Sequence, residues 1–155
     1  MQRLSATLLE SLVHDVTTAA GLGPLQPATR LTWPKRLVSA SIRFAGATEG
    51  ELRIFVVPGA LPHLAADILG VSPEDPAGAA LGEEALAELA NVLLGALLGR
   101  WIVAPTLYHM GLPEVHRVRG LSIAPPASSD GCCSVAFIDP RNHPLGVDVR
   151  FRSLP

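Results

Sequence analysis

The chain has 155 residues, 48% of them hydrophobic and 17% charged, which is enough apolar material to bury the core of one domain and too much for a disordered segment. Its formal net charge is −2 and it contains no run of basic residues, so it lacks the electrostatic attraction by which proteins bind nucleic acid. We therefore expect a single domain over residues 1–155 that has no nucleic-acid partner.

The most apolar segment, residues 85–104, is not expected to cross a membrane. Glu88, Asn91 and Arg100 interrupt it, and its longest uncharged stretch, residues 89–99, is shorter than the roughly 18 to 20 apolar residues that a bilayer requires. The N-terminal segment lacks the charged start, apolar centre and cleavage site of a signal peptide. These features predict a cytoplasmic protein with no membrane contact.

The sequence offers no pattern for a metal site or a bound nucleotide. Cys132 and Cys133 are adjacent in an apolar run, so we expect two buried, reduced thiols rather than a disulfide framework or a spaced metal site. The histidines do not share a helical turn with a second metal ligand in any known zinc-binding pattern. Glycine-rich phosphate loops and the serine nucleophile motif are also absent from the sequence. We expect no metal and no cofactor bound by this chain itself.

The first half of the chain predicts a helix, a β-hairpin and a second helix. Apolar residues follow helical spacing over residues 2–20, and strand-like alternation over 37–44 resumes in 51–57 after a loop that contains Gly46 and Gly50. A second amphipathic helix is predicted from Pro58 to Leu69, and a loop over residues 72–78 follows it.

The second half predicts one long helix and two late strands. The helix is expected from Glu83 to Gly99 or Trp101, and the strands over 132–138 and 146–151 with a turn at 139–144. Residues 105–120 read as short segments punctuated by proline and glycine. The fold class is therefore α/β (α+β), with an antiparallel or mixed sheet packed against an N-terminal helix and two further helices.

The two sides of the long helix differ in chemistry. Apolar positions that include Leu86, Leu89, Leu93 and Leu97 fall on one side at 3.6-residue spacing, and Glu84, Glu88, Asn91, Gly95 and Gly99 fall on the other. A carboxylate and a carboxamide one turn apart project in the same direction, so Glu88 and Asn91 can act on one object. Gly95 on the same side lets another backbone approach closely. This narrow polar side is predicted to be a docking face.

The segment Glu84-Ala-Leu-Ala-Glu88-Leu-Ala-Asn91 resembles the signature of the CheC/CheX family of chemotaxis phosphatases, which carries Glu-x-x-Asn on a long helix. The match falls on Glu88 and Asn91, and Glu84 occupies the preceding position where the family has Asp or Ser. The order of the expected elements also agrees with the family, and Pro113 lies near the proline expected after the helix. A single Glu-x-x-Asn is more similar to the CheX branch than to CheC, whose members commonly carry two.

The resemblance implies a protein phosphatase that hydrolyses the aspartyl phosphate of a CheY-like response regulator. It implies that Asn91 orients the attacking water, that Glu88 pairs with a lysine of the receiver, and that Glu84 and Gly95 contact the docked partner. It also implies that Mg²⁺ is bound by the receiver rather than by this chain.

Two other functions stay open at this stage. A binding module of the same fold, serving as a receiver sensor or flagellar-switch adaptor with weak hydrolysis, is favoured by the extra negative charge of Glu84 near Glu88. A purely structural dimerisation domain would leave the polar side of the helix unexplained. We expect Trp33 and Trp101 to serve the core or its rim, and His63 with Asp67 to lie on a solvated helix face rather than to form an acid–base pair.

Self-association is the first testable expectation. The late strands, bounded by turns, are predicted to offer an edge for sheet extension, as CheX-like proteins are understood to do, and a homodimer should result. Light scattering at micromolar concentration measures the mass directly. A monomeric mass would contradict the dimer and would leave the prediction for Glu88 and Asn91 untouched.

Overall fold

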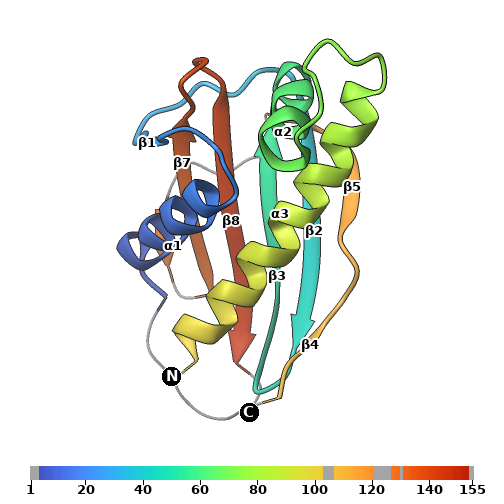
Figure 1. Ribbon diagram of the computed structural model, residues 1–155. Coiled ribbons are helices and arrows are strands. Elements are labelled where there is room, and N and C mark those ends of the chain that lie inside the picture. Colours follow the sequence, from blue (N-terminus) through green and yellow to red (C-terminus); the bar gives the residue numbers. More distant parts are fainter. Residues whose placement is uncertain (1–3, 103–106, 121–126, 130, 154–155) are drawn as a thin grey trace.

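Antiparallel pairing joins all the strands of the computed structural model, which describes residues 4–102, 107–120, 127–129 and 131–153 (Figure 1). The helices in these residues are α1 (Ala6–Ala19), the short 3₁₀ helix η1 (Pro58–Ala60), α2 (Leu61–Leu69) and α3 (Gly78–Trp101). The strands are β1 (Gln26–Pro27), β2 (Arg36–Ala45), β3 (Thr48–Val56), β4 (His109–Met110), β5 (Glu114–Arg119), β6 (Ala127–Ser129), β7 (Cys132–Ile138) and β8 (Pro144–Ser153). The predicted α+β class with a sheet and three helices is confirmed.

The described residues form one sheet with the order β1-β7-β8-β3-β2-β4, in which β5 also pairs with β2 and β6 with β7. The C-terminal strand β8 lies in the middle of this sheet, because it pairs with β7 on one side and along the whole of β3 on the other. The predicted late hairpin is therefore present, but β8 has no free edge and the outer edge of β7 is partly covered by β1 and β6. The homodimer stays a prediction, and the edge expected for it is limited to the part of β7 that β1 and β6 leave open.

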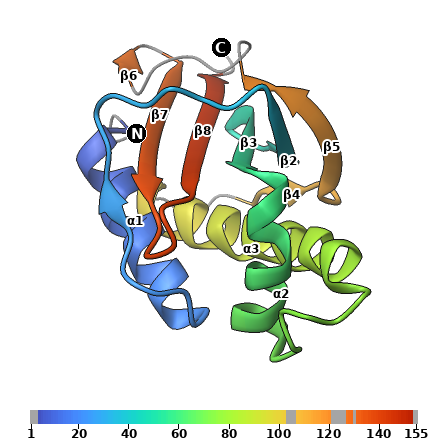
Figure 2. The ribbon, with the colours of Figure 1, turned by 90° about the horizontal axis from the view of Figure 1, so that it is seen from above.

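The core lies between the sheet and the three helices, which all cover the same face (Figure 2). Alternate residues of each long strand point toward the helices because side chains in a strand alternate between its two faces. These inward residues are Val38, Ala40, Ile42, Phe44, Leu52, Ile54, Val56, Cys133, Val135, Phe137, Leu145, Val147 and Val149. The alternation that predicted the hairpin thus corresponds to one buried face.

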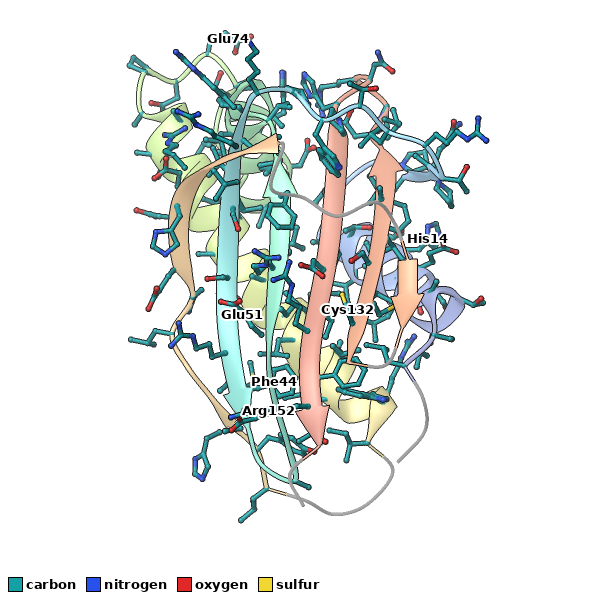
Figure 3. The ribbon with its side chains drawn as sticks, turned by 180° about the vertical axis from the view of Figure 1, so that it is seen from behind. His14, Phe44, Glu51, Glu74, Cys132 and Arg152 are labelled. Carbon is teal, nitrogen blue, oxygen red and sulfur yellow. The ribbon has the colours of Figure 1, made fainter. Side chains whose placement is uncertain are left out.

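The opposite face of the sheet is covered at one end by the segment that leads from β1 to β2 (Figure 3). Trp33 in this segment lies with its ring centroid 6.5 Å from that of Phe55 on β3. Leu37 is also fully buried on this side although it takes no part in the main core. Trp33 and Trp101 therefore belong to two different apolar clusters, one at the rim and one in the core, as predicted.

The long helix begins earlier than the sequence indicated, at Gly78 instead of Glu83. The alanines that follow Gly78 are strong helix formers, and the chain turns into the helix where Asp75 Oδ1 accepts a hydrogen bond from the Ala77 N–H at 2.8 Å. Gly82 does not end the helix. A Cβ atom at this position would lie 2.2 Å from the carbonyl oxygen of Leu61, so Gly82 allows close contact between α2 and α3.

Other boundaries also differ from the predictions. The helix α1 begins at Ala6 after Ser5, whose hydroxyl oxygen accepts a hydrogen bond from the Leu8 N–H, rather than at residue 2. Gly50 lies inside β3 and not in the hairpin loop, since it pairs with Phe44 on β2 and Phe151 on β8. A Cβ there would lie 2.1 Å from the carbonyl oxygen of Arg150, so this close pairing requires glycine. Residues 105–120 include β4 and β5, whose mostly exposed side chains provide no buried alternation by which to recognise strands.

None of the helices in the described part of the chain combines the length and the apolar character needed to span a bilayer.

The orientation of α3 predicts which substitutions destabilise the fold. Leu93 is 1% exposed, so Leu93→Ala should lower the free energy of unfolding by about 2–5 kcal/mol, and Leu89→Ala should act in the same way. Glu84 is exposed, and Glu84→Ala should change the free energy of unfolding by less than about 0.5 kcal/mol. Chemical denaturation followed by circular dichroism measures both. Equal losses for Glu84→Ala and Leu93→Ala would mean that the helix is rotated differently.

Candidate functional site

The helix α3 crosses the sheet diagonally, with α2 beside its first half and α1 beside its second half (Figure 1). Most of its circumference is therefore covered, and the buried residues of the helix are Gly78, Gly82, Ala85, Leu86, Leu89, Ala90, Leu93, Leu94, Leu97, Leu98 and Trp101. Trp101 closes the end of the core against Phe151, with 4.7 Å between ring centroids. Only a narrow strip of α3 is left at the surface.

This exposed strip contains the residues that the sequence indicated for the site. Glu84, Glu88 and Gly95 are exposed, and Asn91 is half-buried. Glu88 and Asn91 are three residues apart in one continuous helix, so both project from the same side of α3. Val92, which is 47% exposed, borders them and adds an apolar contact to the strip.

The fold does not use the polar groups of Glu88 and Asn91. Within the residues that the structure describes, neither side chain forms a hydrogen bond or an ion pair. Asn91 can both donate and accept hydrogen bonds through its amide, and Glu88 offers a carboxylate to a cation. An Asn in the middle of a helix is unfavourable for the helix itself, which makes a role outside the fold the better explanation.

Other charged residues of α3 have clear structural partners. Glu83 pairs with Arg117 on β5, and Arg100 pairs with Asp15 on α1 at 2.8 Å. These two ion pairs lie on the flanks of the helix and join it to its neighbours. The exposed acids Glu84 and Glu88 have no such partner among the described residues, so they are available to a docked molecule.

The glycines on the strip are not required by packing. A Cβ atom added at Gly95 or at Gly99 would meet no atom within 4 Å. Glycine in a helix interior costs about 1 kcal/mol relative to alanine, so the fold itself would be more stable with a side chain at these positions. Their effect is to leave the second half of the strip bare, which suits close approach of another protein.

His63 and Asp67 do not form a pair, and they do not lie on a freely solvated face as the sequence suggested. The side chains of His63 and Asp67, both on α2, point toward the turn between β7 and β8 and are partly buried there. The His63 ring lies 5.9 Å from that of His143, and Asp67 accepts a hydrogen bond from Arg141 at 3.2 Å. These contacts fasten α2 to the β7–β8 turn, so both residues serve the fold.

A polar network on the sheet face opposite the helices was not found from the sequence. Asp148 on β8 is buried, forms an ion pair with Arg53, and accepts hydrogen bonds from Ser134 at 3.0 Å and Arg150 at 3.2 Å. The thiol of Cys132, which is labelled in Figure 3, also donates to Asp148, at 3.5 Å. The only sequence signal for the network was the alternation of polar residues along β7 and β8.

The Cys132 thiol is not prepared for nucleophilic chemistry. Burial raises the pKa of Cys132, and the nearby Asp148 carboxylate raises it further, so the thiol stays protonated near neutral pH. Cys133 is fully buried in the core, as predicted, whereas Cys132 is only partly buried. Among the described residues, no group of three or more His, Cys, Asp or Glu side chains could hold a metal ion.

Comparison with known proteins finds likeness in structure only. No protein-family model and no curated protein matches the sequence. The CheX chemotaxis protein from Vibrio vulnificus has a TM-score of 0.74 at 17% identity, covering 98% of this chain and 99% of that one. A chain of the CheX–CheY–BeF3–Mg²⁺ complex from Borrelia burgdorferi has a TM-score of 0.72 at 16% identity, covering 98% and 100%.

A CheC-like superfamily protein from Shewanella sp. PV-4 has a TM-score of 0.72 at 20% identity, covering 98% of this chain and 100% of that one. The likeness thus extends over nearly the full length of each chain, including α3 and the sheet beneath it. The arrangement of three helices on one face of an antiparallel sheet is therefore the CheX and CheC-like fold.

Proposed function

We propose that this protein is a phosphatase that hydrolyses the aspartyl phosphate of a CheY-like response regulator. The observation that carries the proposal is the pair Glu88 and Asn91, which projects from the exposed strip of α3 without a partner in the described residues. The fold supports it, because a chain of this fold occurs in a complex with CheY. The receiver would dock on the strip formed by Glu84, Glu88, Asn91 and Gly95.

In the proposed reaction the oxygen of a water molecule attacks the phosphorus atom of the receiver's phosphoaspartate. The bond between phosphorus and the aspartate oxygen breaks, which leaves a free carboxylate on the receiver and inorganic phosphate. The Asn91 amide holds the water in line with the bond that breaks, by donating to it and accepting from it. No residue of this chain forms a covalent bond to the phosphoryl group, so the protein needs no activated nucleophile.

Glu88 contributes through its charge. Its carboxylate pairs with the active-site lysine of the receiver, which fixes the orientation of the two proteins and places Asn91 opposite the phosphoryl group. Phosphoryl transfer depends mainly on positioning and on neutralisation of negative charge, and Mg²⁺ held by the receiver would supply the latter. This division of roles asks for no metal ligand from this chain.

A second candidate function is a receiver-binding module that hydrolyses poorly. The observation in its favour is Glu84, which is exposed and lies one turn before Glu88 on the same strip. Like charges four residues apart on a helix repel each other, and the added charge disfavours approach of an acidic receiver surface. Such a protein would sense the phosphorylated state of the receiver or act as an adaptor at the flagellar switch.

The first kinetic prediction concerns Asn91. Asn91→Ala should lower the maximal rate of dephosphorylation by about a hundredfold, because an amide that orients water acts in the transition state. Binding of receiver activated with beryllofluoride should be unchanged within about twofold, since the amide adds little to docking. Phosphate release and calorimetric titration measure the two quantities. A loss of binding equal to the loss of rate would contradict this role.

The second kinetic prediction concerns Glu88. Glu88→Ala should raise the half-saturating concentration of phosphorylated receiver by about tenfold and also lower the rate, because an ion pair across the interface is lost. The effect should be larger at low ionic strength, where charges are less screened. Glu114→Ala is the matched control, since Glu114 is exposed on β5, and its substitution should leave both values unchanged.

The two candidate functions give different results with the unmodified protein. Phosphate release from the cognate phosphorylated receivers, accelerated by the protein and dependent on Asn91, supports the phosphatase. Binding of the phosphorylated receivers through Glu88 without any acceleration on any of them would overturn the phosphatase and support the binding module.

A further inference from the structure

One large apolar side chain of α3 stays exposed on the exposed strip. Val92 is 47% exposed, whereas the leucines of this helix are buried or half-buried. Val92 lies four residues after Glu88 and three before Gly95, so these residues follow one another along the same side of the helix. The apolar group therefore occupies the middle of the strip, between the polar residues of its first half and the bare glycines of its second half.

The fold gains little from a valine at this position. Val92 is not a member of the core cluster formed by the described residues, nor is it packed against that cluster. A β-branched side chain loses rotamer freedom in a helix, so alanine would form the helix better. The place of Val92 beside Glu88 and Asn91, rather than its exposure alone, indicates a contact outside this chain.

The surroundings of Val92 have the composition of a protein–protein interface, in which apolar groups lie at the centre and polar groups at the rim. At one end of the strip Glu84 and Glu88 are exposed and have no partner among the described residues. The other end is bordered by Arg100, which is exposed and pairs with Asp15 on α1. A Cβ atom built at Gly95 would meet no atom within 4 Å, so a partner can approach Val92 from that side.

We propose that Val92 is the apolar anchor of receiver docking, an inference that rests on the function proposed above. The receiver, rather than a second copy of this chain, covers Val92, because Val92 is continuous with Glu88 and Asn91 on one strip. The unpaired acids beside it also complement the active-site lysine of a receiver. The receiver surface that meets Val92 is therefore an apolar one next to that lysine. Glu88 and Asn91 act on the phosphorylated site, and Val92 contributes affinity.

The test compares Val92→Thr with the unmodified protein, because threonine keeps the branched shape of valine and replaces one methyl group with a hydroxyl. Calorimetric titration with a CheY-like receiver activated by beryllofluoride and Mg²⁺ measures binding. Val92→Thr should weaken this binding by about fivefold, since a methyl contact is lost and the hydroxyl gives up water on docking. In turnover assays the change should appear in the half-saturating concentration of phosphorylated receiver and not in the maximal rate.

Two further readouts separate an apolar contact from an ion pair. The weakening caused by Val92→Thr should be the same at low and at high sodium chloride, whereas the weakening caused by Glu88→Ala should be larger at low salt, because salt screens charges. Val92→Thr should also make the heat-capacity change of binding less negative, because less apolar surface is buried in the complex.

Leu112→Thr is the matched control. Leu112 is 87% exposed, which is more than Val92, but it lies between β4 and β5 and not on α3. Its substitution should leave receiver binding within about twofold of the unmodified protein. Both threonine variants should unfold within about 2 °C of the unmodified protein, because neither side chain belongs to the core of the described residues.

Receiver binding that Val92→Thr leaves unchanged would overturn this proposal alone, and so would equal weakening by Leu112→Thr. If Val92→Thr instead dissociates a dimer in light scattering while receiver binding is unchanged, a second copy of this chain covers Val92 and the proposal is wrong. Absence of receiver binding by the unmodified protein would overturn both this proposal and the proposed function. Binding that depends on Val92 without any hydrolysis would support the anchor and overturn only the phosphatase.

Discussion

Burial of the apolar side of α3 against the sheet is the interaction on which the rest of this structure depends. Leu86, Leu93 and Leu97 are at most 1% exposed, and the helix is held at both ends by Gly82 against α2 and Trp101 against Phe151. Successive residues of a helix are about 100° apart, so a rotation by one position would turn polar side chains into the core without partners. The packing that stabilises the fold therefore also determines that Glu88 and Asn91 face outward.

Charge is distributed unevenly around this helix. The exposed strip carries Glu84 and Glu88, which favour a cationic group on a docked partner. The ion pair between Glu83 and Arg117 lies on the flank of the helix and joins α3 to β5. Of the acids of α3, only those on the exposed strip are thus left without a partner in the described residues.

The face of the sheet opposite the helices is stabilised by a polar network rather than by apolar packing against a helix. No helix within the described residues covers its centre, which holds Asp148, a buried carboxylate that is compensated by Arg53 and Arg150. A buried charge of this kind must be paired, and removal of one of its partners would leave part of the charge uncompensated. The Cys132 thiol joins this network with a raised pKa, so it is an unreactive member of the structure. The groups that the proposed reaction would use, Glu88 and Asn91, lie on the helix side.

The sequence by itself determined the long helix, the direction of Glu88 and Asn91, and the hairpin of β2 and β3, because helical and strand periodicity are local properties of the chain. The positions that it left undecided depend on neighbours distant in sequence. The sequence places Gly50 in a loop and starts the long helix after Gly82, and only the packing of β8 and α2 against these glycines shows that both lie inside regular elements. Likewise, only the register between β2 and β5 brings Arg36 opposite Arg119. Local periodicity carries no information on which strand becomes the neighbour of another, so the position of β8 in the middle of the sheet was decided by the tertiary structure alone.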